Sequence, residues 1–262
     1  MGATSGIGEH VAESLAATGW RVGVAGRKVD RMKALKEMFP DSIEWEAIDI
    51  TKSEAPRKLL SLIRKIGGMD IYFHVAGIGF FDPKLDIQRE VDTAETNVVG
   101  FTRMIDTAFH YFRNVGKGHI AIISSVAGTK GIGEIAAYSA SKRYQQNYIE
   151  ALEQLSRMHG LKIAFTDIRP GWVRTPLLDP DRKYPMTMKE GEVVPMILKA
   201  LKKRTRIAVI DRRWAAAVFF WRLIPGRLWV KIPVTLSKPA EKPSEVAICL
   251  LYTSPSPRDR TR

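Results

Sequence analysis

Short apolar runs alternate with amphipathic stretches along most of the chain. The runs are rich in β-branched and aromatic residues and predict strands at residues 21–26, 43–50, 69–77, 118–125, 161–171 and 206–211. In the intervals, apolar residues recur at the spacing of a helix face and predict helices at residues 30–39, 54–66, 91–115, 136–159 and 192–203. This alternation, with no internal repeat, predicts an α/β fold in which helices cover both faces of a doubly wound parallel sheet.

The start of the chain departs from this pattern. Gly2, Gly6 and Gly8 form a turn that runs directly into a helix, and only Met1 stands before it. Such a turn needs a preceding strand to hold it in place. We therefore expect Met1 to be an internal residue and the first β-strand to be missing from this sequence.

The C-terminal end of the chain also departs from the alternation of strands and helices. Residues 249–259 (CLLYTSPSPRD) have no helical or strand periodicity and resemble the in-frame translation of a sequencing adapter. The alternative is an ordinary disordered tail rich in serine and proline. We expect the natural sequence to end near Ile248. The expected segments are a dinucleotide-binding catalytic domain (1–211), a basic aromatic segment (212–236), a tail (237–248) and the adapter translation (249–262).

Composition excludes several classes of protein. With 45% hydrophobic and 26% charged residues, the chain is too apolar for a disordered protein. Its single cysteine, Cys249, excludes a disulfide framework and a thiolate zinc cluster. The five histidines are scattered without the spacing of ligands, so no metal site is predicted. No apolar run is long enough for a membrane-spanning helix.

The positive charge is concentrated in one region. The net charge is +13, and the stretch Lys199–Lys231 holds ten basic residues and one acidic residue, Asp211, which leaves +9 there. A nucleic-acid-binding surface spread over the whole domain would look different, so no nucleic-acid partner is predicted.

Within this basic stretch, Trp214–Ile232 is apolar and aromatic and is interrupted by Arg222 and Arg227. Aromatic side chains with flanking cations suit the interface of an anionic membrane. The alternative is a helix that packs over the substrate pocket with its arginines in solvent. We favour peripheral attachment to the inner face of a membrane by residues 212–232 of a cytoplasmic protein.

Two features indicate a dinucleotide cofactor. In the glycine turn, backbone N–H groups can approach a pyrophosphate because side chains are absent, and the following helix contributes its positive dipole. Arg27 and Lys28 follow the strand at 21–26, where the 2′ group of the ribose would lie. A basic pair there suits a 2′-phosphate, although two solvated surface cations would look the same. The sequence therefore favours NADP(H) over NAD(H).

A tyrosine and a lysine form the candidate acid–base pair. Tyr138 and Lys142 stand four residues apart on one face of a predicted helix. A tyrosine needs a nearby cation to favour its phenolate, because its ordinary pKa is about 10. Ser125 lies 13 residues upstream of Tyr138, at the end of a predicted strand. This serine favours the catalytic interpretation over an ordinary surface Tyr–Lys pair.

Together these motifs resemble those of the short-chain dehydrogenase/reductase family, which is NAD(P)-dependent and has a Rossmann-type fold. The segments GATSGIG, AIDI, NVVG, IISSVAG, YSASK and RPGWVRTPL match the family's motifs in order, over roughly residues 1 to 211. The resemblance implies that Asn97, Ser125, Tyr138 and Lys142 are the catalytic residues.

The resemblance also implies a role for each of them. Tyr138 would exchange a proton with the carbonyl or alcohol oxygen, and Ser125 would hydrogen-bond the same oxygen. Lys142 would bind the nicotinamide ribose and lower the pKa of Tyr138, and Asn97 would hold a water in a proton relay through Lys142.

Further positions are expected to contact the dinucleotide. Among them, Asp49 would contact the adenine amine, and Thr175 would lie near the nicotinamide carboxamide. The expected contacts are Gly2, Ser5, Gly6, Ile7, Gly8, Arg27, Lys28, Asp49, Ile50, Ala76, Gly77, Tyr138, Lys142, Pro170, Gly171, Val173 and Thr175.

The chain departs from the family pattern at two places. After the fourth family strand the usual Asn-Asn-Ala-Gly is replaced by His74, Val75, Ala76 and Gly77, and Met1 replaces the usual threonine of the glycine motif. We expect His74 to be structural and to hydrogen-bond neighbouring backbone.

The leading hypothesis is an NADP(H)-dependent oxidoreductase that interconverts a carbonyl and an alcohol. The stretch 176–195, with Leu177, Leu178, Met186 and Met188, is expected to cover the pocket, which suggests an apolar or lipid-linked substrate. The alternatives are a non-catalytic dinucleotide-binding or scaffold protein and a sugar-nucleotide epimerase, which would need a larger substrate domain. The helices at 91–115 and 136–159 are those the family uses to dimerise, so a homo-oligomer is expected by analogy.

Overall fold

The computed structural model describes residues 1–178 and 184–235. The expected tail (237–248) and adapter translation (249–262) lie outside the described residues, as do residues 179–183 of the stretch expected over the pocket.

Strands and helices alternate as the sequence pattern predicts. The strands are β1 (Val22–Gly26), β2 (Ile43–Ala47), β3 (Ile71–His74), β4 (Lys117–Ile123), β5 (Lys162–Arg169) and β6 (Ile207–Val209). The α-helices are α1 (Gly6–Ala17), α2 (Val29–Met38), α3 (Ala55–Lys65), α4 (Ile87–Ala94), α5 (Phe101–Val115), α6 (Ala136–Met158), α7 (Glu190–Lys203), α8 (Arg212–Leu223) and α9 (Gly226–Trp229). Shorter turns are η1 (Glu95–Gly100), η2 (Val126–Thr129) and η3 (Gly133–Ile135).

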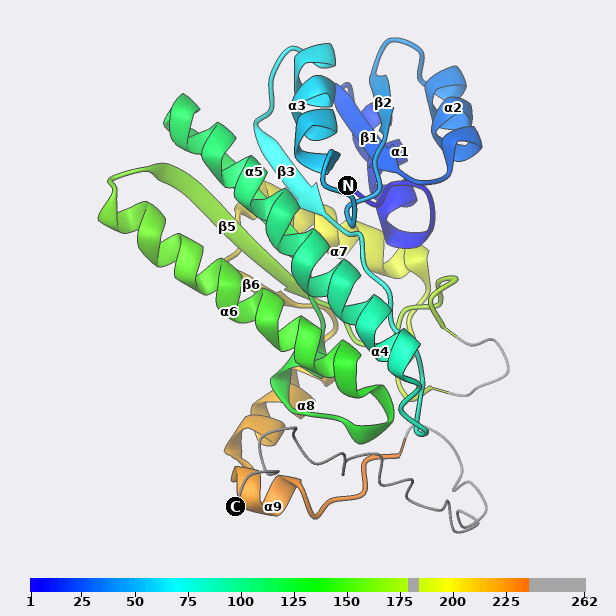
Figure 1. Cartoon of the computed structure of the whole chain (residues 1–262), viewed down its shortest axis with the longest axis vertical. Helices are drawn as coiled ribbons and strands as arrows, with labels where there is room; N and C mark the ends of the chain where they lie inside the picture. The colour runs from blue at the N-terminus through cyan, green and yellow to red at the C-terminus, as the bar shows by residue number, and fades with distance from the viewer. Residues whose placement is uncertain (179–183, 236–262) are drawn as a thin grey trace, which may run out of the picture.

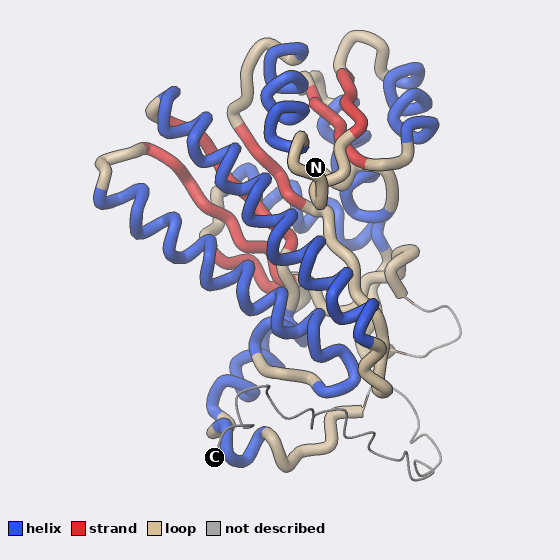
Figure 2. The backbone as a smooth tube through the Cα atoms, in the orientation of Figure 1, coloured by secondary structure: helices blue, strands red, loops and turns tan. Residues whose placement is uncertain are grey.

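All the strand pairs of the described residues are parallel. β1 pairs with β2, and β3, β4, β5 and β6 form a second group in that order (Figure 2). Parallel neighbours need a crossover connection, which the intervening helices provide. The fold is therefore of the α/β class with a doubly wound parallel arrangement, as predicted.

Met1 and Gly2 lie between the two groups of strands. The Met1 nitrogen donates to the Phe73 carbonyl at 2.9 Å, and the Met1 carbonyl accepts from the Val75 N–H at 2.9 Å. On the other side, the Gly2 N–H donates to the Ala25 carbonyl at 2.8 Å. The carboxyl ends of β1 and β3 are thereby joined through this short segment. A strand before Met1 stays a prediction.

Two layers of helices cover the two groups of strands. Helices α3, α5 and α6 pack on one face, and α1, α7 and α8 pack on the other (Figure 1). Successive side chains of a strand point to opposite faces. In β4, Ile120 and Ile122 therefore join the first core, and Ala121 and Ile123 join the second.

One long helix contains an irregular turn. It runs from Ile87 to Val115 as α4, η1 and α5, and η1 is a π-helical turn. The helix starts earlier than the predicted 91–115 because the Asp86 side chain caps it, accepting from the N–H groups of Gln88 and Arg89. Apolar periodicity does not reveal such a cap, since it lies outside the apolar face.

The observed strands are shorter than the predicted ones. β3, β4 and β5 end at His74, Ile123 and Arg169, and the residues that follow leave the sheet at its carboxyl edge. This is the edge at which open parallel sheets bind ligands.

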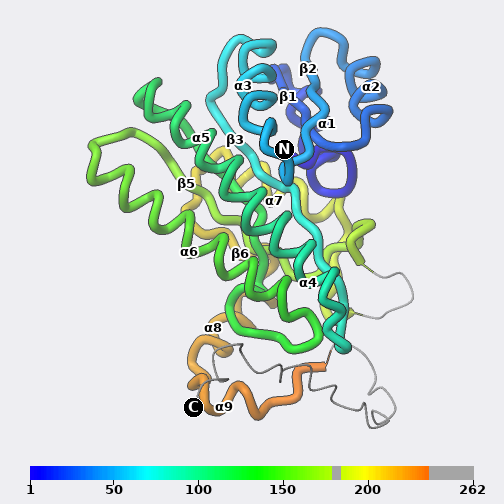
Figure 3. The backbone as a smooth tube through the Cα atoms, in the orientation of Figure 1, coloured from blue at the N-terminus to red at the C-terminus, as the bar shows by residue number. Residues whose placement is uncertain are grey.

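The basic aromatic segment folds into two helices after the last strand. α8 and α9 are separated at Pro225 and lie at the end of the molecule far from β1 and β2 (Figure 3). Among the described residues, no helix combines the length and the hydropathy needed to cross a membrane.

Candidate active site

A cavity of about 560 Å³ opens along the carboxyl edge of the strands. Its walls come from the glycine turn, the ends of β1 to β5, and the segments that follow β5. Among the candidate catalytic residues, Ser125, Tyr138 and Lys142 line it. Asn97 lies behind Lys142, so the structure brings all four into one region.

Lys142 is held from two directions. Its ammonium donates to the carbonyl of Ile123 at 2.9 Å and to the side-chain oxygen of Gln145 at 3.0 Å. The nitrogen also lies 5.6 Å from the centre of the Tyr138 ring. Burial lowers the pKa of Lys142 to about 8, and the charge of Asp167 opposes this change. The lysine is therefore oriented, close to the phenol and unusually ready to lose its proton.

Tyr138 stands between Lys142 and Ser125. Burial raises the pKa of the Tyr138 phenol, and a hydrogen bond with the Ser125 side chain opposes this rise. The ring packs on Gly79, where an added Cβ would lie 2.4 Å from the ring carbon Cδ2. Tyr138 is thus a partly buried, protonated phenol with a hydrogen-bond donor beside its oxygen.

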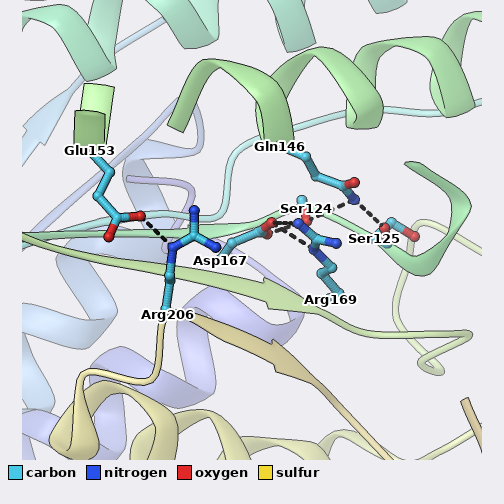
Figure 4. A network of polar contacts seen from close by, with 7 residues as sticks. All are labelled: Ser124, Ser125, Gln146, Glu153, Asp167, Arg169 and Arg206. Carbon is cyan, nitrogen blue, oxygen red and sulfur yellow. Dashed lines mark hydrogen bonds and ion pairs between the residues drawn. The ribbon is translucent and has the colours of Figure 1, made fainter. Parts of the chain in front are cut away.

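Ser125 is supported by a buried polar network (Figure 4). Gln146 of α6 donates to the Ser125 carbonyl at 2.8 Å, and the Ser124 hydroxyl donates to the Asp167 carboxylate. That carboxylate also pairs with Arg169, whose Nε lies 2.7 Å from Oδ2. A buried ion pair with further hydrogen bonds holds its neighbours in one arrangement.

Asn97 is fully buried in the π-helical turn η1. Its side chain accepts from the Ile78 N–H at 2.9 Å and donates to the Ile78 carbonyl at 2.6 Å. Its main-chain carbonyl accepts from the Gln145 amide at 3.0 Å. The main-chain carbonyl of Asn97, the residue expected to hold a water, is therefore bound to a side chain.

The glycine turn leaves room for a phosphate group. Gly2 has a φ of +84°, and an added Cβ would lie 2.5 Å from the Ala76 nitrogen. At Gly8 an added Cβ would lie 2.1 Å from the Gly2 oxygen, so the turn closes only without side chains. Ser5 begins α1 without a side-chain capping bond, which leaves N–H groups of the first turn for a ligand.

The expected dinucleotide contacts follow this cavity, with one exception. Gly8 lies beneath the turn and does not line the cavity. The others line it: Gly2, Ser5, Gly6, Ile7, Arg27, Lys28, Asp49, Ile50, Ala76, Gly77, Tyr138, Lys142, Pro170, Gly171, Val173 and Thr175. The residues present therefore fit a dinucleotide that extends from the turn to Tyr138.

Charged groups mark the end of the cavity nearest β1. Arg27 and Lys28 are exposed there, and Lys28 is the N-cap residue of α2. Burial alone would raise the pKa of Asp49, but hydrogen bonds from Thr51 and the charge of Arg27 leave it lowered. The Asp49 carboxylate accepts from the Thr51 N–H at 3.0 Å and is thereby oriented.

The opposite end of the cavity is apolar and aromatic. Leu177 and Leu178 line it as expected, but Met186 and Met188 do not: Met188 is buried against the core, where it pairs with Val173. Further apolar walls include Phe81, Ile132, Ile135, Trp172, Trp214 and Trp221. This apolar end is thus built by the segment that follows β5, by the segment between β4 and α6, and by α8.

Comparison with known proteins decides the family. A family profile described as short chain dehydrogenase matches residues 1–185, more than half of the chain. This chain belongs to the short-chain dehydrogenase family. An uncharacterized oxidoreductase of Mycobacterium tuberculosis is 32% identical over 246 residues, which cover 88% of this chain and 92% of that protein.

Solved structures have the same fold. A 3-ketoacyl-(acyl-carrier-protein) reductase from Brucella melitensis, complexed with NADH, is similar with a TM-score of 0.72 and 22% identity, over 80% of this chain and 94% of that one. An alcohol dehydrogenase from the archaeon Thermococcus sibiricus, complexed with 5-hydroxy-NADP, has a TM-score of 0.69 and 22% identity, over 80% and 92%. This short-chain dehydrogenase is therefore an oxidoreductase by family, with a Rossmann-type fold.

The dehydrogenase differs from the family pattern at His74. The ring is buried, and its Nδ1 lies 3.0 Å from the Tyr72 hydroxyl. Burial lowers the pKa of His74 well below its ordinary value, so the ring stays neutral. It also packs edge-on against Phe101 at 5.1 Å between centroids, as a structural residue would.

Sequence reasoning missed several residues of this dehydrogenase site. Gln145 and Gln146 contact candidate catalytic residues, yet on the sequence they are only polar positions of a helix. Their one available signal is spacing, because Gln145 lies one turn after Lys142 and therefore on its face. Trp214 and Trp221 could not be assigned to the pocket without the position of α8.

Proposed function

We propose that this protein is an NADP(H)-dependent oxidoreductase that interconverts a carbonyl and an alcohol on an apolar or lipid-linked substrate. The observation that carries this proposal is the placement of Ser125, Tyr138 and Lys142 in the middle of one cavity, between a phosphate-sized turn and an apolar chamber. A non-catalytic dinucleotide-binding protein would have no use for a partly buried tyrosine beside a buried lysine at this point.

The chemistry divides between cofactor and protein. A bound nicotinamide supplies or accepts the hydride. In the reductive direction, Tyr138 donates its hydroxyl proton to the carbonyl oxygen, and Ser125 hydrogen-bonds the same oxygen. Lys142 stabilises the phenolate left on Tyr138. Asn97 holds the Ile78 backbone and, through Gln145, the lysine.

Cofactor preference is inferred from charge. Arg27 and Lys28 line the cavity where β1 ends, and charge-assisted hydrogen bonds to a 2′-phosphate suit both side chains. Asp49, the nearby acid, is engaged by Thr51. This arrangement favours NADP(H) over NAD(H).

The substrate is inferred from the apolar end of the cavity. Its walls are aromatic and aliphatic side chains around Tyr138. Burial of apolar surface contributes about 25 cal/mol per Å² to the binding free energy, which favours a substrate with a hydrocarbon portion. A sugar would leave buried polar groups without hydrogen-bond partners.

Helix α8 lies between the cavity and the surface of the protein, and each of its two faces has a proposed role. Trp214 and Trp221 face the cavity, while Phe219, Phe220 and Leu223 of the same helix are exposed. Arg212, Arg213 and Arg222 flank the exposed side chains. We infer that this exposed face binds an anionic membrane at the inner, cytoplasmic surface. A homo-oligomer stays an expectation by analogy.

The test is a turnover screen of the full chain. Ketones and aldehydes of increasing chain length are offered with NADPH and, separately, with NADH, and oxidation of the nicotinamide is followed by absorbance. We expect turnover with NADPH and a KM that falls as the hydrocarbon portion lengthens. Tight NADPH binding without turnover of any compound would instead favour a dinucleotide-binding protein.

A further inference from the structure

Gln145 occupies a position between two candidate catalytic residues. Its side-chain oxygen accepts from the Lys142 ammonium at 3.0 Å, and its side-chain nitrogen donates to the Asn97 main-chain carbonyl at 3.0 Å. The side chain is 1% exposed. The orientation of the amide follows from its partners, because an ammonium can only donate and a carbonyl can only accept.

This bridge stands where the family resemblance implies a water. A water between Lys142 and the Asn97 carbonyl could pass protons along, whereas an amide holds both groups without gaining or losing a proton. The remaining acceptor of the lysine is the Ile123 carbonyl at 2.9 Å, on β4. Two of the three ammonium protons are therefore directed into the protein, and the third is left for the cavity.

We propose that Gln145 is a positioning residue that takes the place of this water, holds Lys142 in its charged, oriented form and closes the route from Lys142 to Asn97. The inference rests on the proposed function, because the orientation of Lys142 matters only if Tyr138 and Lys142 act on substrate and cofactor.

The charge of Lys142 depends on few other groups. Tyr138 faces it from α6, His74 from β3 and Asp167 from β5. Tyr138 and His74 are neutral at ordinary pH, since burial raises the pKa of the former and lowers that of the latter. Asp167 is paired with Arg169. Removal of the Gln145 oxygen should therefore change the pKa of Lys142 directly.

The experiment measures the pKa of Lys142 without cofactor or turnover. The full chain is labelled competitively with acetic anhydride across a pH series, and acetylation of the Lys142 peptide is followed by mass spectrometry. In Gln145→Leu the acceptor is lost, so the pKa of Lys142 should fall by about one unit. In Gln145→Glu a carboxylate replaces the acceptor, so the pKa should rise by about one unit or more.

The control is Gln154→Leu, an exposed glutamine of the same helix, which should leave the pKa of Lys142 unchanged. If Gln145→Leu does not fold, as judged by circular dichroism, the glutamate variant alone decides. Opposite shifts support the proposal, and an unchanged pKa of Lys142 in the folded variants overturns it.

Turnover provides a second, separable readout. In Gln145→Leu the decline of carbonyl reduction at high pH should begin about one pH unit lower, because the ammonium is lost earlier. If the wild-type chain turns over no carbonyl compound, the proposed function is wrong. The labelling experiment still tests separately whether Gln145 controls the pKa of Lys142.

Discussion

In Tyr138 the ring packs against the protein, whereas the hydroxyl is the group proposed to transfer a proton. Its ring is held against Gly79, and its oxygen interacts with Ser125. Removing only the hydroxyl leaves the packing of the ring in place, because phenylalanine has the same ring. Loss of activity in such a variant would then result from the missing hydroxyl proton and not from a change in the fold.

We predict that Tyr138→Phe lowers kcat by roughly 10² to 10⁴-fold. The affinity for NADPH, measured by fluorescence titration, should change by no more than a few-fold, since the phosphate turn and β1 end are untouched. Substantial residual turnover would remove Tyr138 from its assigned role as proton donor.

At the other end of the cavity, Arg27→Asp should weaken NADPH binding by roughly 10 to 100-fold, because it deletes a charge-assisted hydrogen bond and adds repulsion. NADH binding should change little. Lys33→Asp, an exposed position of α2, makes the same change in net charge as a control. Equal losses for the two cofactors in Arg27→Asp would show that Arg27 does not contact the phosphate.

At the scale of elements, helix α8 has two faces with different surroundings. Trp214 and Val218 are buried, whereas Phe219 and Phe220 are 61% and 63% exposed. The two interpretations of the segment in the sequence, a membrane-binding helix and a pocket cover, are therefore compatible, since each uses one face.

We predict that the full chain cosediments with vesicles containing anionic lipid at low salt and dissociates at high salt, because the basic side chains lose about 1 kcal/mol each as screening increases. Changing Phe219 and Phe220 together to serine should abolish cosedimentation without changing NADPH affinity. Retention of the wild-type chain in the supernatant at low salt would show that the exposed face does not bind lipid.

The elements also show what a sequence can and cannot predict. Every predicted strand and helix has a counterpart, because apolar periodicity reports directly on which face is buried. The π-helical turn at Asn97 and the cap at Asp86 were not predicted, since they depend on hydrogen bonds rather than on apolar spacing. Motif spacing likewise located Tyr138 and Lys142, but the partner of Lys142 on its own helix had no motif.

For the whole molecule, buried histidines connect stability to pH. His119 of β4 is 1% exposed, its Nε2 lies 2.8 Å from the Thr166 hydroxyl, and its Nδ1 is buried without a partner among the described residues. Burial, with a smaller contribution from the charge of Arg204, lowers its pKa to about 4. The unfolded chain binds a proton at this histidine below about pH 6.5, whereas the folded chain binds it only below about pH 4.

We predict that the free energy of unfolding decreases as the pH falls from about 6.5 to about 4, by on the order of 3 kcal/mol from His119 alone. Urea unfolding across this range measures it. His119→Gln should flatten the dependence, and the exposed His159→Gln serves as the control. If the slope is the same in both variants, the acid sensitivity comes from other groups.

The π-helical turn has a consequence for how this chain can change in length. An α-helix advances about 100° per residue, so a turn with one additional residue offsets the faces of α4 and α5 by that angle. Deleting the exposed Val99 would restore a regular helix, but it would rotate either Asn97 away from Ile78 or Phe101 out of the core. Single-residue insertions and deletions between Ile87 and Val115 should therefore be rare among functional relatives.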